Sequence, residues 1–161
     1  MKLFTLSGVV TIFAVLALAP SVTSVAVAQD HSEHVTLTPA DLKWDKVASL
    51  PPGANVAVIA GNPAEPGPFT IRLKFPANYK IPAHSHSVSE VVTVLSGTFN
   101  GGTGDKLDPA KTKALQAGSV SVMPANMHHF AWTKQATIVQ ISSTGPFDVN
   151  YVNPADDPRK Q

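Results

Sequence analysis

The sequence predicts an all-β domain, a sandwich or barrel with one short helical turn ahead of it. Seven short β-rich segments follow one another, at residues 56–60, 70–75, 91–95, 120–123, 130–133, 137–141 and 147–152. The 14 prolines and 10 glycines of the chain punctuate these segments, and strands at this spacing are typical of sandwiches and barrels. Within 70–75, apolar residues alternate with Arg72 and Lys74, which is the period of a strand with one buried face.

Residues 1–28 have the layout of a secretory signal peptide. Lys2 follows Met1, residues 9–19 form a short apolar run, and Ala26 and Ala28 provide the small residues of a cleavage site. The run is too short for a transmembrane anchor, so we expect cleavage after Ala28 rather than a retained membrane helix. No cysteine follows for lipid attachment, and no pair of arginines precedes the run. We therefore expect export by the general route, to the periplasm or as a secreted protein.

The remaining residues, 29–161, are interpreted as one domain with its core at about 50–152. Thr38 followed by Pro39 resembles a helix N-cap with proline at the first helical position, so a helical turn is expected through about Lys46. Residues 101–113 have no apolar pattern and are predicted to be a surface loop. The polar tail 153–161 is expected to be extended or frayed.

The charge balance argues against nucleic acid as a partner. The whole chain has 12 basic and 11 acidic residues, and removal of Lys2 with the signal peptide leaves 11 of each. A neutral domain has no basic field to hold a phosphate backbone. The chain has no cysteine, so thiolates are not available and any metal must be held by histidine and carboxylate side chains.

The first candidate site motif is the run His84-Ser-His86-Ser-Val-Ser-Glu90, with Gly97 further on. Side chains at every second position share one face of a strand. On that interpretation His84, His86 and Glu90 converge on one face as metal ligands, in a strand that is buried on both sides. The alternative is a surface strand that is polar by chance. If the strand instead lies in the barrel, charged side chains without a metal would face the core at high cost.

The second motif runs from Gly118 to His129. Gly118 suits a tight turn into a strand, and Pro124 and Asn126 suit a second turn, because asparagine tolerates positive φ. His129 follows five residues after Pro124.

Together the two motifs resemble those of the cupin superfamily. The first family motif, G-x5-H-x-H-x3,4-E-x6-G, is matched by His84, His86, Glu90 and Gly97, with Asn78 in place of the initial glycine. In the second family motif, G-x5-P-x-G-x2-H-x3-N, this chain has Asn126 for the middle glycine and Thr133 for the final asparagine. All four positions that hold metal in the family are filled, so the resemblance implies that His129 is the third imidazole ligand beside His84, His86 and Glu90.

The resemblance implies a jelly-roll-type antiparallel β-barrel, often dimeric, that holds one divalent metal ion. In the family, three histidines and one glutamate bind Mn, Fe, Ni, Cu or Zn and leave positions open for water or substrate. The ligand types agree with this range of metals. Because the metal would be acquired outside the cytoplasm, where raw affinity decides, we expect Zn or Cu first, Mn or Fe close behind, and Ni as a further option.

Several other residues have open assignments. His128 would point away from the face of His129, so it either supports the site from outside the ligand set or lies at the rim. Phe130 and Trp132 are expected to pack between the sheets or in a dimer contact.

The remaining candidates are weaker. His31 and His34 form either an accessory metal-binding arm or a solvated terminus, and Tyr79, Arg72 and Gln140 are candidates for the cavity mouth.

Three functions are compatible with these residues. The first is a metal-dependent enzyme acting on a small organic molecule, of the oxygenase, decarboxylase or isomerase type, for example a cupin dioxygenase. The second is a non-catalytic module that senses or binds a metal or ligand. The third is metal storage or a structural ion. The sequence names no catalytic residue beyond the ligands and does not decide whether the protein is an enzyme.

Overall fold

The computed structural model describes residues 34–161. The chain divides into two units, Met1–Val35 and Thr36–Gln161, and the second contains the fold described below. The predicted signal peptide and His31 lie outside the described residues. Across residues 34–161, no helix is long and apolar enough to cross a membrane.

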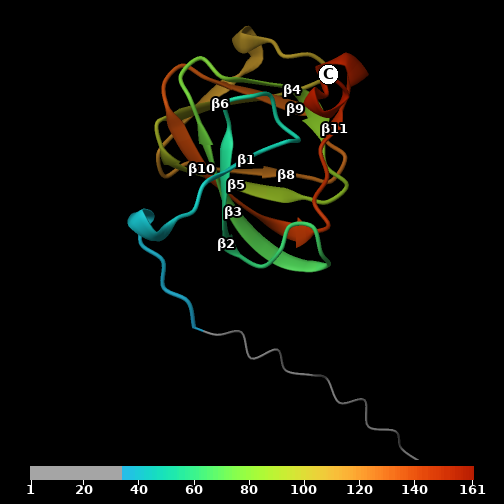
Figure 1. Ribbon diagram of the computed structural model, residues 1–161. Helices are drawn as coiled ribbons and strands as arrows, with labels where there is room; N and C mark the ends of the chain where they lie inside the picture. Colours follow the sequence, from blue (N-terminus) through green and yellow to red (C-terminus); the bar gives the residue numbers. More distant parts are fainter. Residues whose placement is uncertain (1–33) are drawn as a thin grey trace, which may run out of the picture. The chain divides into compact units, whose positions relative to one another are not determined.

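Two antiparallel sheets make up the domain (Figure 1), which confirms the predicted all-β class. The six-stranded sheet has the order β1 (Asp45–Lys46), β2 (Asn55–Ala60), β3 (Gly67–Phe75), β10 (Thr137–Gly145), β5 (Glu90–Ser96) and β8 (Val120–Met123). The five-stranded sheet has the order β11 (Asn150–Tyr151), β4 (Lys80–Ser85), β9 (His129–Thr133), β6 (Thr98–Thr103) and β7 (Lys113–Gln116).

The alternation in β3 places its side chains as the sequence predicts. Ile71, Leu73 and Phe75 are buried in the core between the sheets. Arg72 instead bonds to Gln140 on the neighbouring β10, with 3.2 Å between Nε and Oε1. Apolar side chains of β5 and β10 complete the same core. Burial of one face of each sheet against the other therefore holds the domain together.

The turns of the two motifs have the backbone geometry that their residues allow. Asn78 and Asn126, which replace family glycines, both have positive φ, 58° and 62°. Gly97 has φ 77°, and a Cβ there would lie 2.5 Å from the carbonyl oxygen of Ala136 and 2.5 Å from Oγ1 of Thr137. Only glycine fits this turn between β5 and β6 without displacing β10.

Some predicted elements differ from the structure. The helical turn is a single 3₁₀ turn, Pro39–Asp41, in which the amide of Thr38 donates to Asp41 Oδ2 at 2.8 Å. It ends well before Lys46, which lies in β1. The segment 147–152 contains only the two-residue strand β11.

The predicted loop 101–113 is wrong at both ends. Its first residues complete β6 and its last residue begins β7, with a 3₁₀ turn at Pro109–Lys111 between them. β6 has the sequence TFNGGT, which lacks the apolar alternation that marks a strand. A Cβ at Gly102 would lie 2.5 Å from the ring of Phe130. The glycine that obscures the strand in the sequence is therefore required by the packing.

The tail is neither extended nor frayed. It forms two 3₁₀ turns, Pro154–Asp156 and Pro158–Lys160. Arg159 pairs with the buried carboxylate of Asp157 at 2.7 Å, and its guanidinium also donates to the carbonyl oxygen of Val149 at 2.7 Å. These bonds fasten the tail to the domain.

Candidate metal centre

The four predicted ligands come from both sheets. His84 lies near the end of β4 and pairs with His129 at the start of β9, in the five-stranded sheet. Glu90 begins β5 in the six-stranded sheet, and His86 lies in the turn between the two strands. The prediction that residues 84–90 form one strand buried on both sides is thus wrong. The chain turns after Ser85 and crosses between the sheets, so the turn rather than strand parity brings Glu90 to the histidines.

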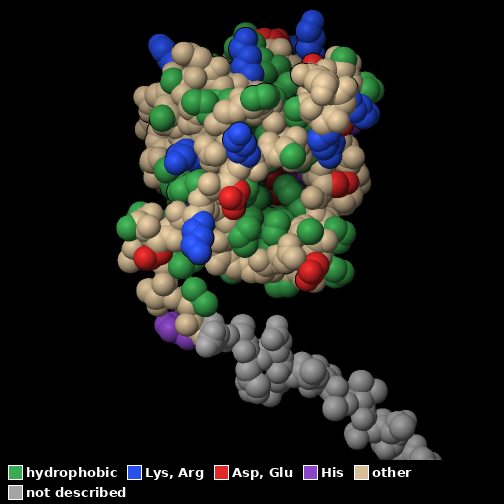
Figure 2. Space-filling view, viewed as in Figure 1, with side chains coloured by type: hydrophobic (Ala, Val, Ile, Leu, Met, Phe, Trp, Pro, Cys, Tyr) green, Lys and Arg blue, Asp and Glu red, His purple; other side chains and the backbone are tan. Residues whose placement is uncertain are grey.

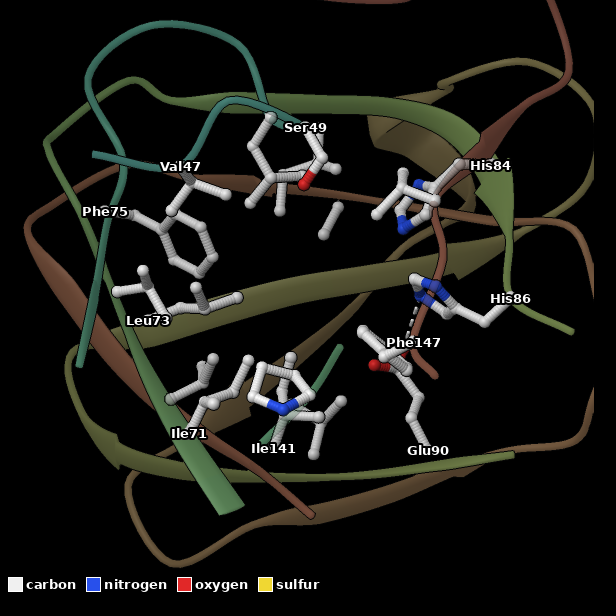
Figure 3. A pocket seen from close by; sticks show the side chains of 18 of the residues that line it. Val47, Ser49, Ile71, Leu73, Phe75, His84, His86, Glu90, Ile141 and Phe147 are labelled. Atoms are coloured by element: carbon white, nitrogen blue, oxygen red, sulfur yellow. Dashed lines mark ion pairs between the residues drawn. The ribbon is translucent and has the colours of Figure 1, made fainter. Parts of the chain in front are cut away.

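The side chains nevertheless converge. All four are buried, and one ring nitrogen from each of the three histidines lies within 4.8 Å of the others. The ring centroids are 4.3 Å apart for His84 and His129, and 5.0 Å apart for His84 and His86. Figure 3 shows His84, His86 and Glu90 at the same end of a cavity. The histidine triad could therefore hold a metal ion.

Backbone carbonyls fix the orientation of each imidazole. His84 and His129 each place Nδ1 against the carbonyl oxygen two residues earlier, at 2.8 and 2.9 Å. His86 places Nδ1 2.5 Å from the carbonyl oxygen of Asp148. Because a carbonyl oxygen only accepts, each Nδ1 carries the hydrogen, and the Nε2 atoms are left to bind a metal or a proton. A carbonyl behind each ring is a common support for a ligating histidine.

One buried nitrogen has no hydrogen-bond partner. Nε2 of His129 lies 3.1 Å from Oε1 of Glu90, without the geometry of a hydrogen bond. Nε2 of His86 is 3.6 Å from the same oxygen. Two lone pairs that face each other in a buried site repel unless a cation lies between them. Three nitrogens and one carboxylate oxygen are also the donor set that divalent transition metals prefer, so these residues fit such an ion.

Burial and neighbouring side chains shift the pKa values of His84, Glu90 and His86. Burial, reinforced by the neighbouring imidazoles of His129 and His86, lowers the pKa of His84 to about 3. Burial would raise the pKa of Glu90, but the imidazoles of His129 and His86 that face its carboxylate outweigh burial and lower the pKa to about 2. Burial likewise opposes the charged form of His86, yet Glu90 raises the pKa of His86. At neutral pH His84 is therefore neutral and Glu90 is a carboxylate, as ligation requires.

The triad opens onto an internal cavity of about 210 Å³ between the two sheets. Twenty residues line it, and fifteen of them have apolar side chains; the exceptions are the three histidines, Glu90 and Ser49. In Figure 3, His84 and His86 lie at one end of the cavity, and Val47, Leu73 and Phe75 lie at the other. Figure 2 shows a hollow in the viewed face of the domain, walled mainly by hydrophobic side chains.

Among residues 34–161, the other two histidines, His34 and His128, do not line this cavity. Nδ1 of His128 lies 2.6 Å from Oδ1 of Asp105, and both side chains are exposed. His34 is exposed as well. The sequence predicts that His128 supports the site or lies at its rim, and the structure places its side chain at the surface, outside the cavity lining.

The predicted mouth residues also lie elsewhere. Tyr79 is buried, stacks on Phe75, and donates its hydroxyl to the carbonyl oxygen of Pro51. Arg72 and Gln140 bond to each other and do not line the cavity.

The two aromatic residues of β9 differ from their prediction too. Phe130 is fully buried but is not part of the core cluster between the sheets. It lies beside Gly102 and the carbonyl oxygen of Lys111, while Nε1 of Trp132 donates to Thr112 at 3.2 Å. The segment between β6 and β7 therefore covers these rings. This cover argues against the predicted dimer contact around Trp132.

Two residues near the site escaped the sequence analysis. The carboxylate of Asp148 accepts hydrogen bonds from the amide of Ser87 at 2.7 Å and from the side chain of Asn150 at 2.6 Å. The ring of Phe147 stacks on His86 with 4.3 Å between centroids. Asp148 lies 62 residues from His86, and no motif spacing links the two. The only signal for this region was its β-rich composition.

Comparison with known proteins gives one family and a common fold. Residues 23–150 match the profile of the family described as "Domain of unknown function (DUF4437)". No curated protein matches the chain in sequence.

Solved structures are similar in fold. An RmlC-like cupin from Shewanella frigidimarina has a TM-score of 0.56 and 19% identity, covering 70% of this chain and 91% of its own. The polyketide cyclase RemF from Streptomyces resistomycificus has a TM-score of 0.65 and 16% identity, covering 80% and 92%. A proposed acetylacetone dioxygenase from Methylibium petroleiphilum has a TM-score of 0.60 and 19% identity, covering 79% and 86%. These similarities show a cupin fold.

Proposed function

This chain belongs to the family described as "Domain of unknown function (DUF4437)" and has a cupin fold, and from that premise we propose that it is a metal-dependent enzyme acting on a small organic molecule. The ligands would be His84, His86, Glu90 and His129. The observation that carries the proposal is the buried Nε2 of His129, which faces the carboxylate of Glu90 at 3.1 Å with no hydrogen-bond partner. A divalent ion would satisfy both groups at once.

The cavity beside the triad favours an enzyme over a structural ion. A structural site is closed by its protein ligands, whereas a catalytic site keeps a position for water or substrate. Here the three histidines and Glu90 form one wall of a cavity of about 210 Å³. A bound divalent ion would supply Lewis-acid chemistry, and a redox-active ion would add oxidative chemistry.

The chain's own residues would bind and orient the substrate. Apolar walls exclude water from the reacting end, and the carbonyl oxygens behind Nδ1 hold the imidazoles in one orientation. Beyond the ligands, the lining offers one hydroxyl, that of Ser49, and no further acid or base. This favours oxygenase, decarboxylase or isomerase chemistry in which the substrate's own acidic proton or dioxygen takes part. One of the structural neighbours is a proposed acetylacetone dioxygenase, which is consistent with such chemistry.

The expected export bears on which metal the site takes up. We propose that the protein loads its metal in the periplasm or outside the cell, where affinity favours Zn or Cu, followed by Mn or Fe. Elemental analysis of protein purified from its own compartment, without refolding, tests this. One equivalent of Zn or Cu is expected, and stoichiometric Mn or Fe would overturn the ranking. Absence of any metal from the native protein would contradict the proposed function itself.

A sensing module is the second candidate, because the chain can bind a ligand in the cavity without turning it over. Activity screening of the metal-loaded protein against carboxylates, diketones and thiols, together with thermal-shift measurements, distinguishes the enzyme from the sensing module. Product formation supports the enzyme. Ligand-induced stabilisation without product, at full metal occupancy, supports the sensor.

We also propose that the protein is a homodimer, through a different face from the one around Trp132. Val91 and Leu95 on β5 and Val120 and Val122 on β8 are between 38% and 62% exposed, although they are large apolar residues. Val91 and Val122 are register partners on adjacent strands. β8 is also at the edge of its sheet. Exposed apolar residues that gather beside an edge strand favour association with another chain.

A further inference from the structure

The apolar lining of the cavity determines which molecules can occupy it, and this inference rests on the proposed metal site. We propose that the cavity accepts an uncharged, largely hydrocarbon molecule that has oxygen donors only at its end near the histidines. A neutral 1,3-dicarbonyl compound with an alkyl tail represents this class. The structure disfavours sugar acids, dicarboxylates and other molecules with a charge away from the metal end.

The absence of a cation from the lining carries this inference. None of the twenty lining residues is lysine or arginine. Strand β3 separates its side chains strictly: Ile71, Leu73 and Phe75 line the cavity, while its two cations lie outside. Arg72 bonds to Gln140, and Nζ of Lys74 lies 4.5 Å from the ring centre of Trp44. A carboxylate at the far end would therefore be buried without a counter-charge, which is costly.

Polar recognition is confined to the metal end. Opposite the histidines, Val47, Leu73 and Phe75 face the cavity, and Ser49 is the one hydroxyl in the lining (Figure 3). A molecule with several hydroxyl groups would lose its bonds to water there and gain at most one in return. A hydrocarbon tail instead gains from burial. The cavity volume of about 210 Å³ limits the ligand to a small molecule.

A matched pair of probes tests the inference. Nonane-2,4-dione and 4,6-dioxoheptanoate carry the same dicarbonyl head and the same number of non-hydrogen atoms, but only the second ends in a carboxylate. The full chain loaded with Zn²⁺, which has no redox chemistry, is titrated with each by calorimetry. We expect the dissociation constant of the dione to be at least about tenfold lower.

A variant pair adds a second readout. Val47→Arg places a cation at the far end of the cavity, and we expect it to improve binding of 4,6-dioxoheptanoate relative to the dione. Val58→Arg is the control, because Val58 is exposed and does not line the cavity; it should leave the ratio of the two dissociation constants unchanged. An unchanged ratio in Val47→Arg would count against the proposed role of the lining.

The outcomes separate this inference from the proposed function. If the zinc-loaded protein binds the carboxylate as tightly as the dione, or binds neither, the inference is overturned while the metal site stands. If elemental analysis shows that the protein holds no zinc, the metal site itself fails. Zinc at one equivalent with preference for the dione supports both.

Discussion

His84 and His129 are register partners on the adjacent antiparallel strands β4 and β9, and their imidazole centroids lie 4.3 Å apart. The pairing brings together two residues that are far apart in the sequence, and each places Nδ1 against the carbonyl oxygen two residues earlier. The sheet pairing sets the positions of these two residues, and the carbonyl oxygens set the orientation of their rings. His86 and Glu90, in and after the turn, depend on less regular contacts.

Replacement of His86 by alanine removes one proposed ligand. We expect bound metal to fall several-fold after dialysis at limiting metal, as measured by elemental analysis. His128→Ala is the matched control, because that histidine is paired with Asp105 at the surface, and its metal content should equal that of the unmodified protein. Unchanged stoichiometry in His86→Ala would refute the ligand assignment.

Asp148 is expected to act through His86 without touching the metal. Its carboxylate bonds to Ser87 and Asn150 and so holds the carbonyl oxygen that supports His86. Loss of a support of this kind typically lowers metal affinity about 10–100-fold. Asp148→Ala should therefore weaken affinity, measured by competition with a chelator, while stoichiometry at saturating metal stays at one. Asp105→Ala, which removes an exposed carboxylate, should change neither quantity.

Metal affinity should fall as the solution becomes acidic. The raised pKa of His86 means that this imidazole keeps its second proton to higher pH than an ordinary histidine, and a metal must displace that proton. His84 and Glu90, with pKa values of about 3 and about 2, need no such step near neutrality. Titration calorimetry in buffers of different ionisation enthalpy should detect proton release below the raised pKa of His86. Affinity that is independent of pH between 5 and 8 would contradict this.

Gly97→Ala should destabilise the fold through both backbone and packing. The position has φ 77°, and the added Cβ would lie 2.5 Å from the carbonyl oxygen of Ala136, so we expect a loss of roughly 2–5 kcal/mol in the free energy of unfolding. Gly118 has φ 88° but open space around the Cβ position. Gly118→Ala should therefore lose only about 1–2 kcal/mol from backbone strain. Denaturant unfolding of both variants measures the difference, and equal losses would exclude the clash.

Val122→Lys tests the proposed dimer face. A lysine on this exposed apolar face of β8 would place a charge in the interface, so we expect the variant to elute as a monomer by size exclusion with light scattering. Val58→Lys is the control, since Val58 is 51% exposed on β2, and should leave the dimer intact. A dimer that survives Val122→Lys places the contact elsewhere, and a monomeric unmodified protein excludes it.

Strands can be predicted from the sequence where apolar and polar side chains alternate. They are missed where close packing requires a glycine in the strand. β3 is recognisable because its apolar and polar residues alternate, whereas Gly102 in β6 is dictated by the ring of Phe130. The site shows the same division. The motif spacings identify the ligands, but not the crossing between sheets, which depends on a turn after Ser85. The support from Asp148 comes from residues that no spacing connects to His86.

The crossing of the first motif from one sheet to the other has a consequence for how the domain resists unfolding. An ion held by Glu90 of β5 and His129 of β9 would join residues 39 positions apart in the sequence, as a covalent cross-link does, and loop closure reduces the entropy of the unfolded chain. This chain has no cysteine. Its thermal stability should therefore be insensitive to reducing agents but sensitive to chelators. The stability of the domain would then depend on the supply of metal, as that of a disulfide-bonded protein depends on redox conditions.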